Sequence, residues 1–453
     1  MSCKNEKNTP NNQRDLITDS LTNIATKEED QKETIKKHTA WSKNAVIYEV
    51  NIRQFSEEGT FDAVTKDLER IKNLGVDIIW LMPIQPIGKK NRKGTLGSYY
   101  AIKDYKAVNP EFGKLDDFKT LVDQAHKLGL KVIIDWVANH TSPDHVWVKE
   151  NLEFYTKDSL GNAPIPTPDT EWTDVADLNY DNPHMREAMQ DAMAYWIIET
   201  NIDGFRCDIA EYVPLDFWVD TRKKLEEHKP LFMLAEGANP ELYQAFDMTY
   251  GWAFKDMIID IADSNKSLSA IPNYLNSIHQ KYDEGNVIMY FTTNHDENSW
   301  NYVERDKFGS NIKNYQALTY FMGGMPLIYN GQESGLNKKI EFFEKDTIDW
   351  GDYKHTSFYQ SLNNILKTHE VLWNNKYAEY EILSTENESL NFIISKDDKH
   401  LAVLQNYSSH PKYVSKISLT GLNLEKSLLP NPKYKVTEKA VEIPPHSTVV
   451  LGQ

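Results

Sequence analysis

The sequence predicts an α/β fold: a closed (β/α)8 TIM barrel with a short inserted domain after the third strand and a C-terminal antiparallel β-sandwich domain. Three observations support this prediction. Eight short apolar runs alternate with helical patterns, a long Pro- and Asp-rich stretch follows the third run, and short strands without helices fill the end of the chain. The count of eight units favours a closed barrel over an open doubly wound sheet.

The strand and helix patterns follow one another in a regular order. The eight expected strands are Val46–Val50, Asp77–Met82, Lys131–Trp136, Gly204–Ile209, Leu231–Ala235, Asp247–Tyr250, Val287–Thr293 and Pro326–Asn330. Apolar residues at helical spacing run from Phe61 to Leu74 before Gly75, and from Leu115 to Leu128 before Gly129, where glycine is a typical helix C-cap. No Gly-rich phosphate loop follows the first strand, which argues against a dinucleotide-binding fold.

The segments outside the strand and helix repeats suggest further domains. Residues 40–375 are expected to form the barrel. Within them, residues 141–183 lack periodicity and are expected to form an inserted domain, because long loops in compact domains are usually functional. Residues 376–453 are expected to form the β-sandwich, without helices. Its expected strands are Leu390–Ile394, Leu401–Asn406, Val414–Ser418 and Ser447–Leu451.

The N-terminal segment, residues 1–39, is too polar to bury a core and is expected to be a disordered tether. Cys3 at its tip resembles the acylated cysteine of a bacterial lipoprotein, although no signal peptide is present in the sequence. We therefore expect a protein of the bacterial cell envelope, either an outer-membrane lipoprotein or a periplasmic protein. The alternative is an accidental cysteine in a cytoplasmic tail.

Charge and cysteine content exclude several classes of protein. The 453 residues carry a formal net charge of −17 without a basic block, which argues against a nucleic-acid partner. No apolar run is long enough for a membrane helix, so a membrane contact is expected only through Cys3. Cys3 and Cys207 are too few for a disulfide framework or a zinc site, and Cys207 is expected to be buried. We expect a monomer.

Carboxylates and histidines gather at the predicted strand ends, where barrel enzymes place their active sites. The third strand ends in the sequence Asp-Trp-Val-Ala-Asn-His, the fourth in Arg-Cys-Asp, the fifth in Ala-Glu and the seventh in Asn-His-Asp. The residues concerned are Asp135, Asn139, His140, Arg206, Asp208, Glu236, His295 and Asp296. One such acid alone is more often a helix cap, but several at successive strand ends point to a shared site.

Arg206 and Asp208 lie on one face of the fourth strand because side chains alternate along a strand. The guanidinium can therefore hold the carboxylate ionised, as a nucleophile requires. A second carboxylate that keeps its proton can act as general acid, and this division of roles is the requirement of glycoside hydrolysis. A third carboxylate can stabilise an oxocarbenium-like transition state.

These four segments, in this order, resemble the conserved regions of the α-amylase family, glycoside hydrolase family 13. The resemblance implies that Asp208 is the nucleophile, Glu236 the general acid and base, and Asp296 the stabiliser of the transition state. It also implies that Arg206 orients the nucleophile. The substrate-binding residues it implies are Tyr100, stacked on a sugar and supported by Asp104, together with His140 and His295 and the supporting residues Asp135 and Asn139.

The resemblance also implies an inserted domain B at residues 141–183, and it leaves open whether a structural calcium ion is bound. Asn139 and Asp177 match calcium ligands of many α-amylases, whereas Glu57–Thr60 replaces the other calcium loop of the family. Two oxygens do not make a site for an ion that takes six to eight. The segment Val175–Asn179 departs from the forms typical of α-amylases, oligo-1,6-glucosidases and neopullulanases, which leaves the bond specificity open. No cofactor is required for the chemistry.

The leading functional hypothesis is a retaining, endo-acting hydrolase of α-1,4-glucans of the starch or glycogen type, or of maltooligosaccharides. A glucanotransferase or branching enzyme would share every catalytic residue, and an α-glucosidase or neopullulanase activity would fit the same fold. A non-catalytic glucan-binding protein is the remote alternative. Such a protein would lose its carboxylates, whereas this sequence keeps Asp208, Glu236 and Asp296.

Overall fold

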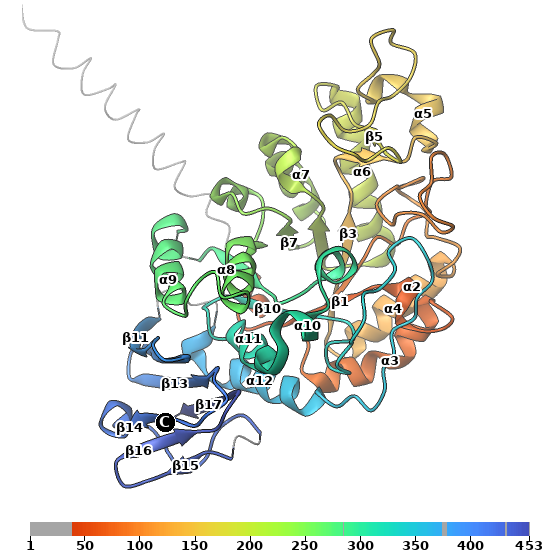
Figure 1. Cartoon of the computed structure of the whole chain (residues 1–453). Coiled ribbons are helices and arrows are strands. Elements are labelled where there is room, and N and C mark those ends of the chain that lie inside the picture. Colours follow the sequence, from red (N-terminus) through yellow and green to blue (C-terminus); the bar gives the residue numbers. More distant parts are fainter. Residues whose placement is uncertain (1–38, 284, 374–377, 431–432, 453) are drawn as a thin grey trace, which may run out of the picture. The chain divides into compact units, whose positions relative to one another are not determined.

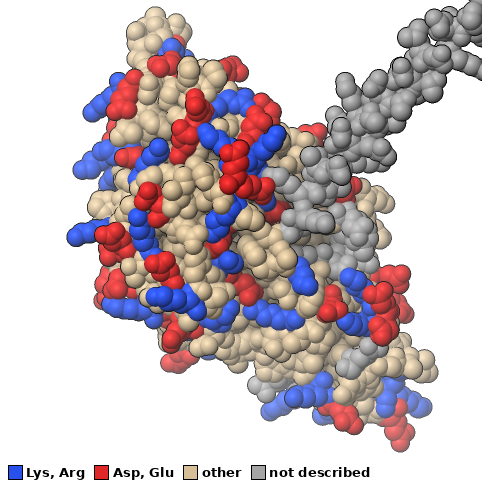
Figure 2. Space-filling model, turned by 180° about the vertical axis from the view of Figure 1, so that it is seen from behind, with Lys and Arg blue, Asp and Glu red and all other residues tan. Residues whose placement is uncertain are grey.

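The computed structural model describes residues 39–283, 285–373, 378–430 and 433–452. The expected tether at 1–39, apart from Thr39, and the expected lipid-bearing Cys3 lie outside these residues. Within the described part, no helix has the length and apolar character needed to cross a membrane. Figure 2 shows that acidic and basic side chains are interspersed over the face turned to the viewer, with no extended patch of one sign.

Eight parallel strands form a closed barrel (Figure 1). Its strands are β1 (Ile47–Val50), β2 (Ile78–Leu81), β3 (Lys131–Trp136), β6 (Gly204–Cys207), β7 (Phe232–Ala235), β8 (Met248–Tyr250), β9 (Val287–Tyr290) and β10 (Met325–Tyr329). Each lies within, or within one residue of, a range predicted from the sequence, so the predicted (β/α)8 barrel is confirmed. The order around the barrel follows the chain, and β10 closes it against β1.

Helices cover the outside of the barrel because each presents one apolar stripe to the strands. The longer ones are α3 (Phe61–Leu74), α4 (Leu115–Lys127), α6 (Pro183–Thr200), α7 (Leu215–Glu226), α8 (Trp252–Ala262), α9 (Ala270–Lys281) and α12 (Thr356–Thr368). The shorter helices of the described chain are α2 (Ile52–Phe55), α10 (Glu304–Phe308), α11 (Ile312–Leu318) and α5 (Val146–Glu150), of which α5 lies in the inserted segment and has no buried residue. Helix α3 ends as predicted at Gly75, whose φ of 98° is in the left-handed region.

Two sets of buried side chains separate the inside of the barrel from its outer layer. Residues of one strand face fill the interior, among them Trp80, Leu234 and Tyr250. Phe205 and Cys207 pack instead into the cluster that the helices cover, as the alternation along the strand predicts. Cys207 is a free, fully buried thiol.

The inserted segment leaves the barrel after β3 and returns at α6. It contains a two-stranded antiparallel pair, β4 (His140–Thr141) with β5 (Ala176–Asp177), and the short helix α5. Helix α6 begins after Asn182, whose side chain caps the first backbone N–H groups. The pairing of His140 with Asp177 ties the base of this segment to the end of β3.

The chain ends in two antiparallel sheets. One contains β11 (Glu379–Ser384), β12 (Ser389–Lys396), β13 (Lys399–Asn406) and β17 (Ser447–Gly452), and the other β14 (Lys412–Ser415), β16 (Ala440–Ile443) and β15 (Lys435–Val436). Two predictions were wrong here. The strand expected at Val414–Ser418 stops at Ser415, and a 3-10 helix, Ile417–Leu419, follows where none was expected.

The barrel and the sandwich share a buried polar contact. Asn314 of α11 donates from Nδ2 to the Asn406 carbonyl at 2.9 Å and accepts from the Thr448 hydroxyl at 2.9 Å. Gln405 donates to the Asn314 carbonyl at 2.8 Å. Buried polar groups of this kind are costly when left unpaired, so this contact specifies how the two parts meet.

Gly204 opens β6 at a φ of 156°, and a Cβ built there would lie 1.8 Å from the Phe232 carbonyl oxygen of β7. We therefore expect Gly204→Ala to lower the free energy of unfolding by roughly 2–6 kcal/mol, the sum of backbone strain and overpacking. Gly161→Ala is the control, since it shares a positive φ but has no atom within 4 Å. Its expected cost is about 1 kcal/mol. Urea unfolding followed by circular dichroism measures both, and equal losses would contradict the close approach of β6 and β7.

Candidate active site

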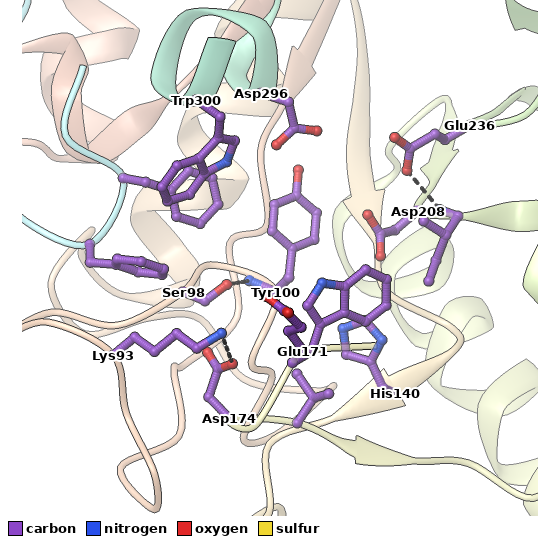
Figure 3. Close-up of a pocket in the computed structure, with 15 residues that line it drawn as sticks. Lys93, Ser98, Tyr100, His140, Glu171, Asp174, Asp208, Glu236, Asp296 and Trp300 are labelled. Carbon is purple, nitrogen blue, oxygen red and sulfur yellow. Dashed lines mark hydrogen bonds and ion pairs between the residues drawn. The ribbon is translucent and has the colours of Figure 1, made fainter. Parts of the chain in front are cut away.

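A cavity of about 620 Å³ opens at the carboxyl ends of the barrel strands. Its size is that of a small-molecule site. The lining combines acids, histidine and aromatic rings (Figure 3). The lining residues are Lys93, Ser98, Tyr100, His140, Glu171, Trp172, Asp174, Val175, Asp208, Ile209, Glu236, Asp296, Trp300, Phe342 and Phe343.

Arg206 lies beneath this cavity, fully buried, and contacts three carboxylates. Its Nη1 atom lies 2.9 Å from Asp135 Oδ1 and 3.0 Å from Asp208 Oδ1, and its Nη2 atom lies 2.8 Å from Glu236 Oε2. Nε donates to the Tyr250 hydroxyl at 3.0 Å. The sequence prediction paired Arg206 with Asp208 alone, whereas the structure makes one guanidinium the shared partner of three acids.

Strand register explains why these groups meet. Arg206 of β6 lies directly beside Asp135 of β3, its partner in the parallel pairing. Asp208 follows the end of β6, where its backbone N–H donates to the Trp136 carbonyl at 3.0 Å. The Ile209 backbone N–H donates to Glu236 Oε2 at 2.8 Å, so the loop after β6 orients the carboxylate after β7.

The pKa of Asp208 departs from the sequence expectation. Burial raises the pKa of Asp208 well above its usual value; Arg206 lowers it, and the neighbouring carboxylates of Glu236 and Asp135 raise it again. The expected effect of Arg206 is therefore present, but burial outweighs it. One positive charge cannot stabilise three buried carboxylates in full, so this group of acids is suited to keeping a proton.

His295 lies between two acids after β9. Its Nδ1 is 2.5 Å from Glu49 Oε1 in β1, and its Nε2 is 3.3 Å from Asp296 Oδ2. Burial lowers the pKa of His295, but Asp296 and Glu49 raise it further, to about 9. The ring is therefore an imidazolium at neutral pH. Glu49 was missed by the sequence interpretation, although an acid within an otherwise apolar strand was a signal.

Tyr100 connects His295 to the acids around Arg206. Its hydroxyl donates to Asp135 Oδ2 at 3.1 Å and lies 2.7 Å from His295 Nε2. Its ring stacks against the His295 ring at 5.6 Å and against the Phe342 ring at 6.3 Å. In Figure 3 the ring stands in the middle of the labelled residues, with Asp296 and Asp208 near its hydroxyl end.

Asp104 does not support Tyr100, contrary to the expectation from the family resemblance. Its carboxylate accepts from the Lys106 backbone N–H at 2.9 Å and stabilises a local turn. Asp135 takes the supporting role, held in place by the Trp80 indole N–H at 3.2 Å as well as by Arg206.

His140 is buried at the edge of the cavity beside Trp172, with ring centroids 5.5 Å apart. Burial lowers the pKa of His140 to about 3, so its ring is neutral and can exchange hydrogen bonds with a hydroxyl group. Asn139 Nδ2 lies 3.2 Å from His140 Nδ1, and the Tyr105 hydroxyl donates to the His140 carbonyl at 3.1 Å. Asn139 and Tyr105 thus position this ring.

Asn139 and Asp177, the predicted calcium ligands, already have side-chain partners. Asn139 Nδ2 donates to the Thr167 hydroxyl at 3.1 Å, and Asp177 Oδ2 accepts from the Thr156 hydroxyl at 2.7 Å. In the part of the chain that the structure describes, no three His, Cys, Asp or Glu side chains gather as metal ligands. These two residues supply too few oxygens by themselves. Calcium therefore stays a prediction.

The cavity also contains residues that the sequence did not reveal. Trp172 and Asp174 come from the inserted segment, Lys93 from the loop after β2, and Trp300 and Phe342 from the loops after β9 and β10. None lies at a strand end or in a periodic pattern. These residues are recognised as part of the site only because the folded chain brings them together around the cavity.

The raised pKa of His295 predicts a pH-dependent contribution to stability. The pKa rises from 6.5 to about 9 in the folded chain, so the stabilisation is complete below pH 6.5 and is lost as pH rises through 9. We expect the stability difference between the wild type and His295→Gln to shrink by about 3 kcal/mol across this window. Urea unfolding at intervals between pH 6 and pH 10 (about one unit apart) measures it. A difference independent of pH would refute the charged state of His295.

The chain is similar to known proteins in both sequence and fold. Residues 18–163 and 169–403 match the family described as "Alpha amylase, catalytic domain". Alpha-amylase 3 of Dictyoglomus thermophilum is 27% identical over 354 residues, which span 69% of this chain and 68% of that protein. Some other curated relatives are matched over smaller shares, from 35% to 65% of their length.

Two crystal structures share the fold over most of the chain. An alpha-amylase from Lactobacillus plantarum has a TM-score of 0.81 at 33% identity, and the maltogenic alpha-amylase AmyB from Thermotoga neapolitana a TM-score of 0.79 at 30% identity. Each match covers 91% of this chain and 99% of the other. The expectation of a glycoside hydrolase is confirmed, and the non-catalytic alternative is set aside. The chain belongs to the α-amylase family of glycoside hydrolases.

Proposed function

We propose that this enzyme hydrolyses α-1,4-glucosidic bonds of maltooligosaccharides or starch-type glucans with retention of configuration. The observation that carries the proposal is the contact of Arg206 with Asp135, Asp208 and Glu236. Through this contact, Arg206 holds a nucleophile, Asp208, and a general acid, Glu236, side by side at the floor of the cavity. Retaining glycosidases require this pair of carboxyl groups.

In the first step Asp208 attacks the anomeric carbon as a carboxylate, while Glu236 donates to the glycosidic oxygen the proton that this group of acids keeps. The bond from carbon to that oxygen breaks, the shortened glucan leaves as an alcohol, and the sugar remains as an ester on Asp208. In the second step Glu236, now ionised, takes a proton from water, whose oxygen displaces Asp208. The Ile209 N–H keeps the Glu236 carboxylate in place through both steps.

The surroundings of the cleaved sugar have complementary charge and shape. The Tyr100 ring offers a flat apolar face and His140 a neutral imidazole, and the buried His295 imidazolium lies 2.7 Å from the Tyr100 hydroxyl. Asp296 has a side chain that is 37% exposed. Its carboxylate can stabilise the positive charge that develops on the sugar in the transition state. These roles support the proposal that Asp296 is the stabiliser.

Three expectations from the sequence remain proposals. They are the lipid anchor at Cys3 with a location in the bacterial cell envelope, a monomeric state, and a structural calcium ion at Asn139 and Asp177. Each rests on the sequence alone and none is needed for the chemistry.

Replacing Asp208 by Asn removes the nucleophile while keeping its shape. We expect Asp208→Asn to fold and to lose activity on maltoheptaose by at least about 10³-fold, because the residues of a catalytic unit act together. Asp104→Asn is the matched control, since that carboxylate only stabilises a turn, and should keep its activity. Initial rates of reducing-sugar release measure both. Substantial turnover by Asp208→Asn would sink its assignment.

Hydrolysis and transfer differ in the acceptor of the second step. With maltoheptaose as the only substrate, a hydrolase yields products shorter than the substrate, because water takes the sugar from Asp208. Chromatographic sizing at early times, alongside digests of amylose and pullulan, checks this and shows whether α-1,6 bonds are cut. Products longer than maltoheptaose that outnumber shorter ones would assign the enzyme to the transferases instead.

A further inference from the structure

The loop at residues 88–97, after β2, carries a charged contact to the inserted segment. Lys93 Nζ lies 3.0 Å from Asp174 Oδ1, and both residues line the cavity. The Asp174 side chain is 5% exposed and that of Lys93 is 35% exposed. A second contact, from Asn91 Nδ2 to the Thr173 carbonyl at 3.2 Å, joins the same two segments.

This loop is braced internally by Arg92 and is held from its other side by the segment after β10. The Arg92 guanidinium donates to the carbonyls of Gly88, Ile87 and Thr95, at 2.8–3.2 Å. The Leu96 N–H donates to the Phe343 carbonyl at 3.1 Å. Gly94, at a φ of 62°, packs so closely that an added Cβ would lie 2.5 Å from Phe343 Cβ. The loop is therefore a supported wall between the inserted segment and the segment after β10.

The position of Glu236 tells which side of the substrate meets this wall. The general acid protonates the oxygen of the leaving group, so the reducing-end part of the glucan lies on the side of Glu236. The part that extends to the non-reducing end lies on the other side of the cleaved bond. In Figure 3 Lys93 and Asp174 lie across the Tyr100 ring from Asp208 and Glu236, and we therefore place the non-reducing part of the glucan toward them.

We propose that the Lys93–Asp174 pair ends the glucan-binding cavity on the non-reducing side, so that the enzyme releases short products of one length from chain ends. This inference rests on the proposed function and replaces the endo action expected from the sequence. The ammonium donates to, and the carboxylate accepts from, hydroxyl groups of the terminal glucose unit. A longer chain would have to break the pair and expose the buried Asp174 carboxylate, which is costly.

The test uses maltohexaose and maltoheptaose labelled at the reducing end, with products sized at initial rates. The wild type should release a single unlabelled length from both substrates. The double variant Lys93→Ala with Asp174→Ala removes the wall without leaving one buried charge alone. It should raise the ratio of longer to shorter unlabelled products by about tenfold or more, since a single pocket contact changes discrimination by such factors.

Lys103→Ala is the matched control. Lys103 Nζ lies 3.8 Å from Asp144 Oδ2 and also joins the stretch between β2 and α4 to the inserted segment, but neither residue lines the cavity. This variant should keep the wild-type product pattern. Mixed unlabelled lengths from the wild type at initial rates would overturn the inference, as would a folded, active double variant with the wild-type pattern.

Failure of the proposed function is distinguishable from failure of this inference. If the wild type cuts neither substrate, the proposed function is wrong, and if Asp208→Asn cuts both, the assignment of Asp208 as nucleophile is wrong. If cleavage depends on Asp208 but product lengths are mixed, only the wall is wrong. Should the double variant fail to fold by circular dichroism, the single-length pattern of the wild type on the two substrates still decides the matter.

Discussion

One buried positive charge, the guanidinium of Arg206, constrains the whole site. A charge taken out of water is costly unless it is paired, and here Asp135, Asp208 and Glu236 pair it from three directions. The aromatic rings of Trp80 and Tyr250 complete its surroundings, 5.2 and 5.6 Å from the guanidinium carbon. Each carboxylate is thereby held by a group that cannot itself give up its proton, so any exchange of protons takes place among the acids.

The barrel makes this arrangement possible because strands from distant parts of the chain end at the same rim. Arg206 lies beside Asp135 because β6 and β3 pair in register. The loop after β6 holds Glu236, which follows β7. His295 and Glu49, separated by 246 positions, meet where the barrel closes. His140 lines the cavity as a neutral ring, whereas His295, which contacts the lining residues Tyr100 and Asp296, is charged, although both histidines are buried. The difference comes from the two acids beside His295.

The sequence was informative wherever a local pattern carries the information. Strand runs such as Lys131–Trp136 are predicted by their apolar, β-branched composition, and Asp208 or Glu236 by its place after such a run. Strands β11 and β15 were missed because none of their residues is buried and they lack a strong pattern. Strand β16 was missed as well, although its residues alternate between half-buried and buried. Asp104 was misassigned because a motif match does not tell where a side chain points, and here it turns to its own backbone.

The sequence by itself determined the eight strands, their order and the acids at their ends, because these follow from hydrophobic periodicity within a few residues. Only the tertiary structure decided that three acids share Arg206 and that burial exceeds its effect on the pKa of Asp208. It alone brought Lys93 to Asp174, from two loops without any recognisable pattern. Charges, pKa values and cavity walls depend on distances between residues far apart in the chain, and those distances exist only once the barrel has closed.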